Sequence, residues 1–141
     1  MKISALVAGK RVETISPSAS VQDLVNSLSI HHIGALVVSR DGRKIDGIIS
    51  ERDVVRAMPG NLDLLIGMHV RDLMTVEVVT CTTDATVDEL MKVMTERRIR
   101  HIPVIDSEGN VISLVSIGDV VKAYITDIDN ERNALRDYVS S

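Results

Sequence analysis

The sequence is poor in aromatic residues, with no Phe, no Trp and only two Tyr among its 141 residues. Single-stranded nucleic acid is commonly bound by stacking bases on aromatic rings, and nucleic-acid-binding surfaces are generally basic. Because aromatic residues are nearly absent and the formal net charge is −4, we expect no nucleic-acid partner. The core must be built from Val, Ile, Leu and Met.

Cysteine, metal-binding patterns and long apolar segments are also scarce. The single cysteine, Cys81, excludes an intrachain disulfide and a Cys-based metal cluster, and we interpret it as a buried, inert thiol. The four histidines have no matching carboxylate spacing, so no metal site is expected. With no nucleophile–base pair and no Gly-rich phosphate loop, the sequence predicts a protein that is not an enzyme. Neither a signal-peptide pattern nor a long apolar span appears, which predicts a soluble cytoplasmic protein with no membrane partner.

An internal repeat decides the fold prediction. The stretches ISERDVVRA (49–57) and VSIGDVVKA (115–123) share Ser, Asp, Val, Val and Ala in register, and the same offset of 66 positions holds over much of both copies. Each copy predicts the order strand, helix, strand, strand, helix. The first strands are expected at 11–15 and 77–81. The hairpins are expected at 35–49, around Asp41-Gly42, and at 102–115, around Glu108-Gly109. One helix of each repeat should follow the N-cap, Ser20 or Thr86, and the other should start at the repeated stretch.

We therefore predict a mixed α+β chain of two β-α-β-β-α repeats, packed together because one repeat cannot bury both faces of so short a sheet. The expected boundaries are 1–60 for the first repeat, 61–69 for a linker, 70–124 for the second repeat and 125–141 for a C-terminal amphipathic helix. In that tail Ile125, Ile128, Leu135 and Tyr138 recur at helical spacing, so it either packs back on the repeats or pairs with another chain. We expect a homodimer to which the tail contributes.

The repeated corners, Ser50-x-x-Asp53 and Ser116-x-x-Asp119, have a structural and a functional interpretation. Structurally, the pattern is a capping box, in which both side chains bond free N–H groups of a first helical turn. Functionally, a helix N-terminus suits a phosphate, and a carboxylate one turn in can hold the two hydroxyls of a ribose. The two interpretations are compatible, and two corners imply two nucleoside-sized sites.

A cluster of cationic residues follows the second repeat's first helix, in the stretch RRIRHIPV (97–104). Arg97 and Arg98 are explained by a helix C-terminus, where cations bond the last carbonyls and interact favourably with the helix dipole. Arg100 and His101 lie beyond the helix, where we favour contact with phosphate, and Arg52 in the first corner is a further phosphate candidate.

The doubled plan, with the motifs LMT, HIPVID, IISERD and LVSIGDVVK, resembles a tandem pair of cystathionine-β-synthase (CBS) domains, and more narrowly the stand-alone bacterial CBS pairs described as signal-transduction proteins. The resemblance covers about residues 3–124. It implies a disc-like module that binds adenosyl ligands (AMP, ADP, ATP or NAD) in clefts between the two motifs, and that signals to a client protein the sequence does not name. A purely structural dimerisation module with no physiological ligand is the alternative.

Site residues follow from the resemblance by position. One site would hold ribose on Ser116 and Asp119 with Arg100 and His101 near its phosphate, and its adenine would lie against Thr14, Ile15, Ile33, Gly34 and Ala35. The related site would use Ser50, Arg52 and Asp53, with Thr80, Cys81, Ile99 and Ile102 beneath the base. The sequence departs from the family pattern at Ser113, where Gly is usual, and has Val37 where the second repeat has Pro103. These departures leave the relative occupancy of the two sites open.

Overall fold

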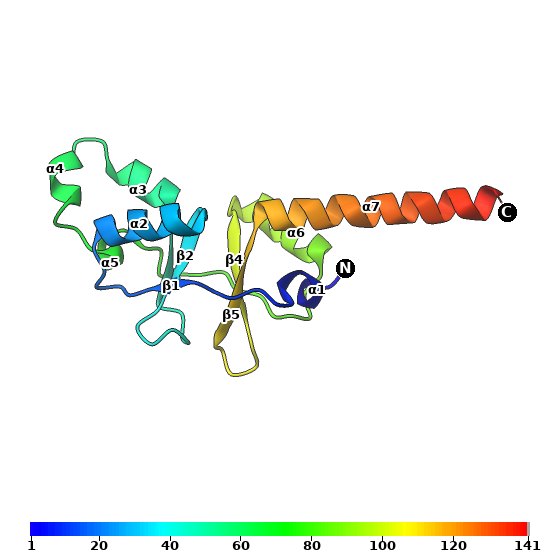
Figure 1. The fold of residues 1–141 in the computed structure, drawn as a ribbon, viewed down its shortest axis with the longest axis horizontal. Coiled ribbons are helices and arrows are strands. Elements are labelled where there is room, and N and C mark those ends of the chain that lie inside the picture. The colour runs from blue at the N-terminus through cyan, green and yellow to red at the C-terminus, as the bar shows by residue number, and fades with distance from the viewer. Residues whose placement is uncertain (141) are drawn as a thin grey trace.

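Two small β-sheets, one from each repeat, form the centre of the molecule in the computed structural model, which describes residues 1–140 (Figure 1). The first sheet has the order β1 (Thr14–Ile15), β2 (Ala35–Val38), β3 (Gly47–Ser50), with β1 parallel and β3 antiparallel to β2. The second sheet pairs β4 (His101–Ile105) with β5 (Val111–Ser116) in antiparallel register. The predicted mixed α+β architecture is confirmed.

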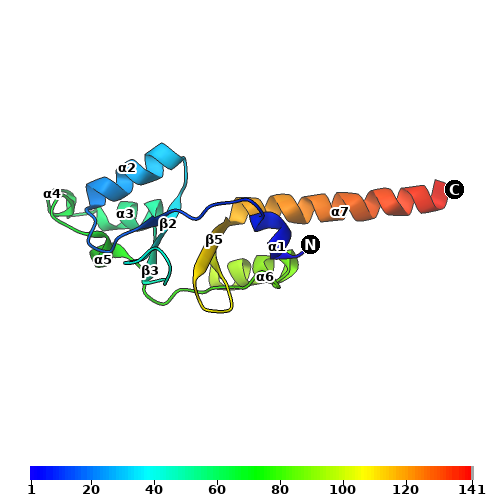
Figure 2. The same cartoon turned by 60° about the horizontal axis from the view of Figure 1, so that its bottom comes forward.

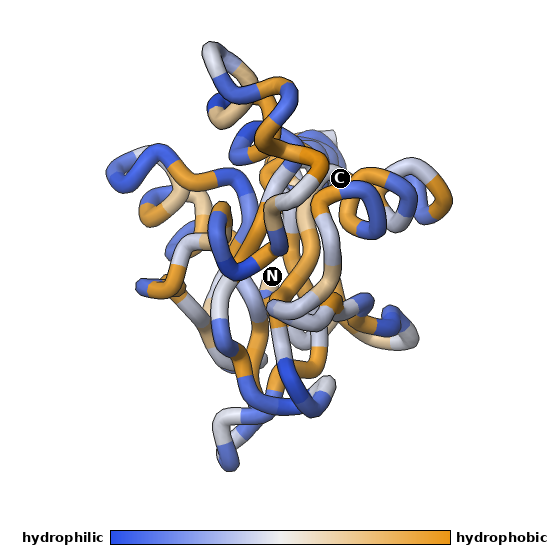
Figure 3. The backbone as a smooth tube through the Cα atoms, turned by 90° about the vertical axis from the view of Figure 1, so that its left-hand side faces the viewer, coloured by the Kyte–Doolittle hydropathy of each residue, from blue (hydrophilic) through white to orange (hydrophobic). Residues whose placement is uncertain are grey.

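Helices cover each sheet and close a separate apolar core. In the first repeat these helices are α2 (Val21–His31) and α3 (Glu51–Ala57), and in the second α6 (Val87–Arg97) and α7 (Ile117–Ser140). The predicted capping boxes are present: Ser20 caps α2 and Thr86 caps α6, each with a side chain three residues later bonding back. Hydrophobic residues follow the strands and hydrophilic ones the outer loops (Figure 3). The buried residues of the two core clusters are Val, Ile, Leu and Ala with Met94, and include no aromatic ring.

The first strand of the second repeat, expected at 77–81, is reduced to an isolated parallel bridge between Cys81 and Val104. The equivalent strand β1 pairs over two residues, Thr14 with Val37 and Ile15 with Val38. Pro103 occupies the position of Val37 in the second repeat, and proline has no backbone N–H to donate to a neighbouring strand. One bonding position is therefore lost, and residues 77–80 run past the sheet as an irregular segment.

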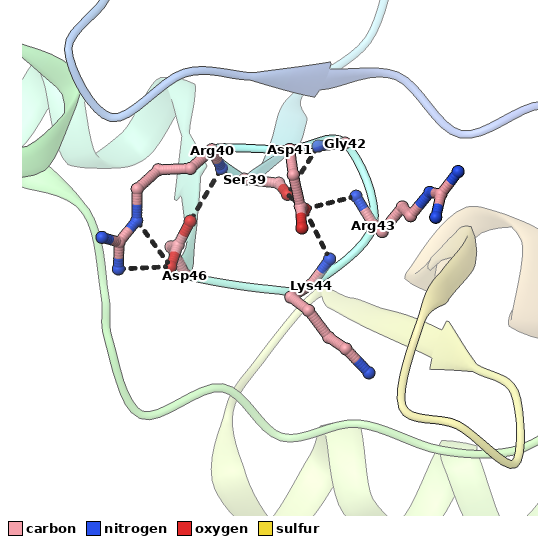
Figure 4. Close-up of polar contacts among 7 residues, drawn as sticks. All are labelled: Ser39, Arg40, Asp41, Gly42, Arg43, Lys44 and Asp46. Atoms are coloured by element: carbon pink, nitrogen blue, oxygen red, sulfur yellow. Dashed lines mark hydrogen bonds and ion pairs between the residues drawn. The ribbon is translucent and has the colours of Figure 1, made fainter.

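The hairpin of the first repeat has shorter strands and a longer loop than predicted, because two carboxylates take up the backbone N–H groups that a longer ladder would use (Figure 4). The Asp41 side chain accepts from the backbone N–H groups of Arg43 and Lys44 at 2.8 and 2.9 Å. Asp46 accepts from the backbone and the guanidinium of Arg40. The loop also bonds the other repeat, since the N–H of Val111 donates to the Arg43 carbonyl at 2.8 Å.

The segments that lead into each repeat are exchanged between the two lobes. Helix α1 (Ile3–Val7) crosses from the first repeat to the second (Figure 1), where Ile3 is fully buried in the core of α6 and α7. Conversely, α5 (Val70–Leu73) packs into the first core through Val70, and the linker before it forms the short helix α4 (Leu62–Leu65). Each lobe therefore needs chain from both halves of the sequence.

The C-terminal tail is the second half of α7, so the repeat's last helix and the predicted tail helix are one element of 24 residues. Beyond the lobes α7 projects away from the rest of the molecule in both views (Figures 1 and 2). Ile128, Leu135 and Val139 are 45%, 66% and 80% exposed. Near its start the tail makes one ion pair with the N-terminal segment, between Asp127 Oδ2 and the Met1 ammonium at 3.1 Å. The apolar residues further along remain exposed, which leaves pairing with another chain as the remaining expectation.

Candidate functional site

A first cleft opens at the corner where β3 runs into α3. Its volume is about 530 Å³, within the range of small-ligand sites. Its lining includes the corner residues Ser50 and Asp53, and the irregular segment before Cys81 supplies a wall with Val78 and Val79. The remaining lining comes from Gly34, Ala35, Ile48, Glu51, Arg52, Val55, Arg56, Thr75, Glu77, Ile99, Arg100 and His101.

A second cleft, of about 370 Å³, opens at the equivalent corner of β5 and α7. Ser116 and Asp119 take the places of Ser50 and Asp53. The segment before β1 supplies the opposite wall with Lys10, Arg11, Val12 and Glu13, and the rest of the lining comes from His32, Ile33, Gly34, Ala35, His101, Ser113 and Leu114.

The two clefts meet at Gly34, Ala35 and His101, which line both of them. Ala35 and His101 are equivalent in the repeat: Ala35 pairs with Ser50 in the first sheet, and His101 pairs with Ser116 in the second. Space there is narrow, because a Cβ added to Gly34 would lie 3.4 Å from Glu51 Oε1 and 3.8 Å from His101 Cε1. The corners of both repeats therefore converge on one point between the lobes.

Each corner is held by the same hydrogen bonds, which confirms the capping interpretation. Asp53 Oδ2 accepts from the backbone N–H of Ser50 at 2.8 Å and from its hydroxyl at 3.0 Å. Asp119 Oδ2 accepts from Ser116 in the same way at 3.2 and 2.9 Å. In both corners Oδ2 serves the cap, so Oδ1 is the oxygen that a ligand would meet.

In the second corner Asp119 also faces a cation, because Lys10 Nζ lies 3.4 Å from Asp119 Oδ1. Partial burial raises the pKa of Asp119, but the hydrogen bonds from Ser116 and the charge of Lys10 outweigh it, so the pKa lies below its usual value. Asp119 is therefore ionised at neutral pH.

His101 stands among charges of both corners. Burial lowers its pKa below 6.5; Glu51 and Asp119 act in the opposite direction, and Arg100 adds to the lowering. The imidazole is consequently neutral at pH 7. It can donate a hydrogen bond to a ligand in either cleft or accept one from it.

The structure brings many of the predicted site residues together, in an arrangement that differs in part from the expected one. Residues expected at the Asp53 site that line the first cleft are Ser50, Arg52, Asp53 and Ile99. Those expected at the Asp119 site that line the second cleft are Ile33, Gly34, Ala35, His101, Ser116 and Asp119. Arg100 lines the first cleft and not the second, where the resemblance had placed it.

Five predicted residues line neither cleft. Ile15 and Ile102 are buried in the two cores, and Cys81 packs against the second core, where burial raises its pKa to about 11. Thr14 and Thr80 complete the five. In both repeats the cleft wall lies a few residues earlier in the chain, at 10–13 and 77–79.

Sequence reasoning missed these wall residues, although a signal was present: a valine recurs at the equivalent positions Val12 and Val78, within the two segments expected as first strands. Among residues 1–140 no group of His, Cys, Asp or Glu side chains is arranged to hold a metal ion. The helices of that same range include none long and apolar enough to cross a bilayer.

Comparison with known proteins places this geometry in a family. The CBS domain matches the chain twice, over residues 4–60 and 70–126. The chain is 40% identical over 124 residues to the mitochondrial CBS domain-containing protein CBSX3 of Arabidopsis thaliana. The match covers 85% of this chain and 60% of that protein, so the chain spans less than two thirds of that relative.

Solved structures agree. The CBS-domain containing protein ATU1752 from Agrobacterium tumefaciens has a TM-score of 0.82 and 38% identity, with 88% of this chain and 99% of that chain covered. CBSX2, solved in complex with AMP, has a TM-score of 0.76 and 25% identity, with coverages of 89% and 96%. The chain therefore belongs to the CBS domain family and carries two copies of the domain.

Proposed function

We propose that the chain is a non-catalytic regulatory module that binds an adenine nucleotide (AMP, ADP, ATP or NAD) in a cleft between its two CBS domains. The observation that carries this proposal is the repeated Ser–Asp corner, which opens onto a nucleotide-sized cleft that also has apolar lining residues. The relative CBSX2, with which AMP is found in complex, supports the same ligand class.

The lining of the first cleft matches the three parts of such a ligand. Half-buried Val78, Val79 and Ile99 offer an apolar wall for the base. The free oxygen of Asp53 can accept from the ribose hydroxyls, which a carboxylate does well because it is an acceptor only. Arg52 and Arg100 are exposed on the lining and can donate to phosphate oxygens.

Thermal unfolding with and without ligand tests the proposal. A ligand that binds only the folded chain should stabilise it by about 2.7 kcal/mol at a hundred times its dissociation constant. We expect a raised melting temperature with at least one of AMP, ADP, ATP and NAD and none with the matched pyrimidine nucleotide CMP. An unchanged melting temperature with all four nucleotides at millimolar concentration would contradict the proposal and favour the alternative of a structural module without a ligand.

We also propose that two copies associate through the exposed half of α7. In proteins most helical stability comes from packing of an amphipathic face, so the exposed tail gains from a partner. Ile128, Leu135 and Val139 share one face with Glu131 and Arg136. In an antiparallel pair with Ile128 opposite Val139 of the partner, Glu131 falls opposite Arg136, so these apolar and charged positions match as an isologous contact requires. Leu135 falls opposite Arg132, whose methylene stem can cover it.

Sedimentation of charge-reversed chains tests this contact. Glu131→Arg should weaken the dimer because it places two cations opposite each other, and the combined Glu131→Arg and Arg136→Glu should restore it. A chain ending at Tyr124 should sediment as a monomer. Dimers of equal strength in all four chains would show that the contact lies on the repeats, and a monomeric full chain would show that there is no dimer.

A further inference from the structure

The two clefts are built from equivalent residues but differ in the wall that faces the Ser–Asp corner. In the repeat, residues 10–13 of the second cleft correspond to 76–79 of the first. Lys10 thus corresponds to Val76, and Glu13 corresponds to Val79. The pairs Arg11/Glu77 and Val12/Val78 keep the same character in both clefts, whereas Glu13 of the second cleft is replaced by Val79 in the first. Lys10 lines the second cleft, and its counterpart Val76 does not line the first.

In the first cleft the corner carboxylate remains available. Asp53 makes hydrogen bonds with Ser50 through Oδ2, and no cation of residues 1–140 lies within ion-pair distance of it. In the same cleft the lining residues Val78 and Val79 are half-buried and apolar. This cleft therefore offers a free acceptor to a diol and a dry surface to a flat base.

In the second cleft the corner carboxylate is fully engaged. Asp119 Oδ2 accepts from Ser116, and its Oδ1 lies 3.4 Å from the ammonium of Lys10. Glu13, in the place of Val79, puts an exposed carboxylate where a base would need an apolar wall, with His31 Nε2 3.8 Å away. The cleft is also smaller, at about 370 Å³ against about 530 Å³.

We propose that the chain binds one adenine nucleotide, in the first cleft, and that Lys10 keeps the second cleft from acting as an equal site by occupying Asp119. This inference rests on the proposed function, since it assigns the nucleotide to one of two clefts. Lys10 determines specificity by competing with the ribose for Asp119, while the wall residues Val79 and Glu13 determine which cleft accepts the base.

Equilibrium dialysis of AMP against the full chain and single variants tests the assignment. The wild type should bind about one AMP per chain in the high-affinity part of the binding curve, its tight phase. Asp53→Asn should weaken that phase at least tenfold, because it removes a charge that accepts hydrogen bonds. Val79→Glu should weaken it too, through a different element, so the result does not depend on the folding of one variant. Asp119→Asn should leave the tight phase within about twofold.

Lys10→Met probes the competing ion pair. An exposed ion pair changes an equilibrium constant by up to about fivefold, so the dissociation constant of AMP at the second cleft should fall by up to about fivefold. Lys92→Met, which removes an exposed lysine of α6 from the same chain, is the matched control and should change neither phase. Melting curves of every variant establish that it is folded.

The outcomes separate the inference from the proposed function. Absence of AMP, ADP, ATP and NAD binding overturns both. Two equal sites per wild-type chain, loss of the tight phase in Asp119→Asn instead of Asp53→Asn, or weaker binding in Lys10→Met overturns the inference while nucleotide binding stands.

Discussion

Replacing Ile3 with alanine tests whether the N-terminal segment is part of the second lobe. Ile3 is fully buried in the core with Val87, Leu90 and Val120, and its N–H donates to the carbonyl of Ala85 at 2.8 Å. Removing a buried isoleucine side chain down to Cβ costs about 2 to 5 kcal/mol. Because α1 lies at the edge of the core and can partly collapse, we expect about 3 kcal/mol, equivalent to about 10 °C in melting temperature for a chain of this size.

The loss should extend to the second cleft. A helix of five residues does not persist without tertiary contacts, so loosening Ile3 should also release Lys10, a few residues further along. Urea unfolding followed by circular dichroism measures the free energy of unfolding, and Ile66→Ala is the matched control because Ile66 is 84% exposed. Equal unfolding midpoints for Ile3→Ala and Ile66→Ala would refute the packing of α1 described here.

Three further results are expected. Gly47→Ala should destabilise by about 1 to 3 kcal/mol, because its Cβ would lie 2.8 Å from the Thr75 carbonyl oxygen, whereas Gly67→Ala, with 3.8 Å to its nearest atom, should stay within about 0.5 kcal/mol in the same urea assay. Native Cys81, with a pKa of about 11 against 9.0, should react with iodoacetamide at pH 8 about a hundredfold more slowly than in the urea-unfolded chain, and equal rates would contradict its burial. Burial lowers the pKa of His101, so as the pH decreases the unfolded chain takes up this proton first, and the free energy of unfolding should fall below pH 6.5. His101→Gln should remove part of that fall. An identical pH profile in the variant would contradict the burial of His101.

Much of the fold was predictable because its local signals agree with its tertiary structure. The N-caps Ser20 and Thr86 mark the helix starts correctly, and the repeat offset predicts two equivalent lobes. The strand at 77–81 was overpredicted because its pairing depends on a single N–H that Pro103 lacks. The exchange of α1 and α5 between lobes leaves no local pattern. Each segment has the sequence of a short amphipathic helix, and that pattern is the same whichever lobe the helix contacts.

The candidate site was predictable at its corners and less so at its walls. Ser50, Asp53, Ser116 and Asp119 could be found because the same pair recurs at the same helical position. The walls lie in segments that end before the first strands, and which residues face a cleft depends on how the lobes meet. The contact of Lys10 with Asp119 joins residues more than 100 positions apart, and periodicity carries no information about such a pair.

A titration of the isotopically labelled chain with AMP, followed residue by residue in ¹H–¹⁵N correlation spectra, tests the central claim most directly. The account predicts saturable shifts at the amides of Ala35, Asp53 and Val79, which come from three separate segments around the first cleft. The amide of Leu135, on the projecting part of α7, should stay in place. Absence of saturable shifts at millimolar AMP, or shifts confined to residues outside both clefts, would contradict it.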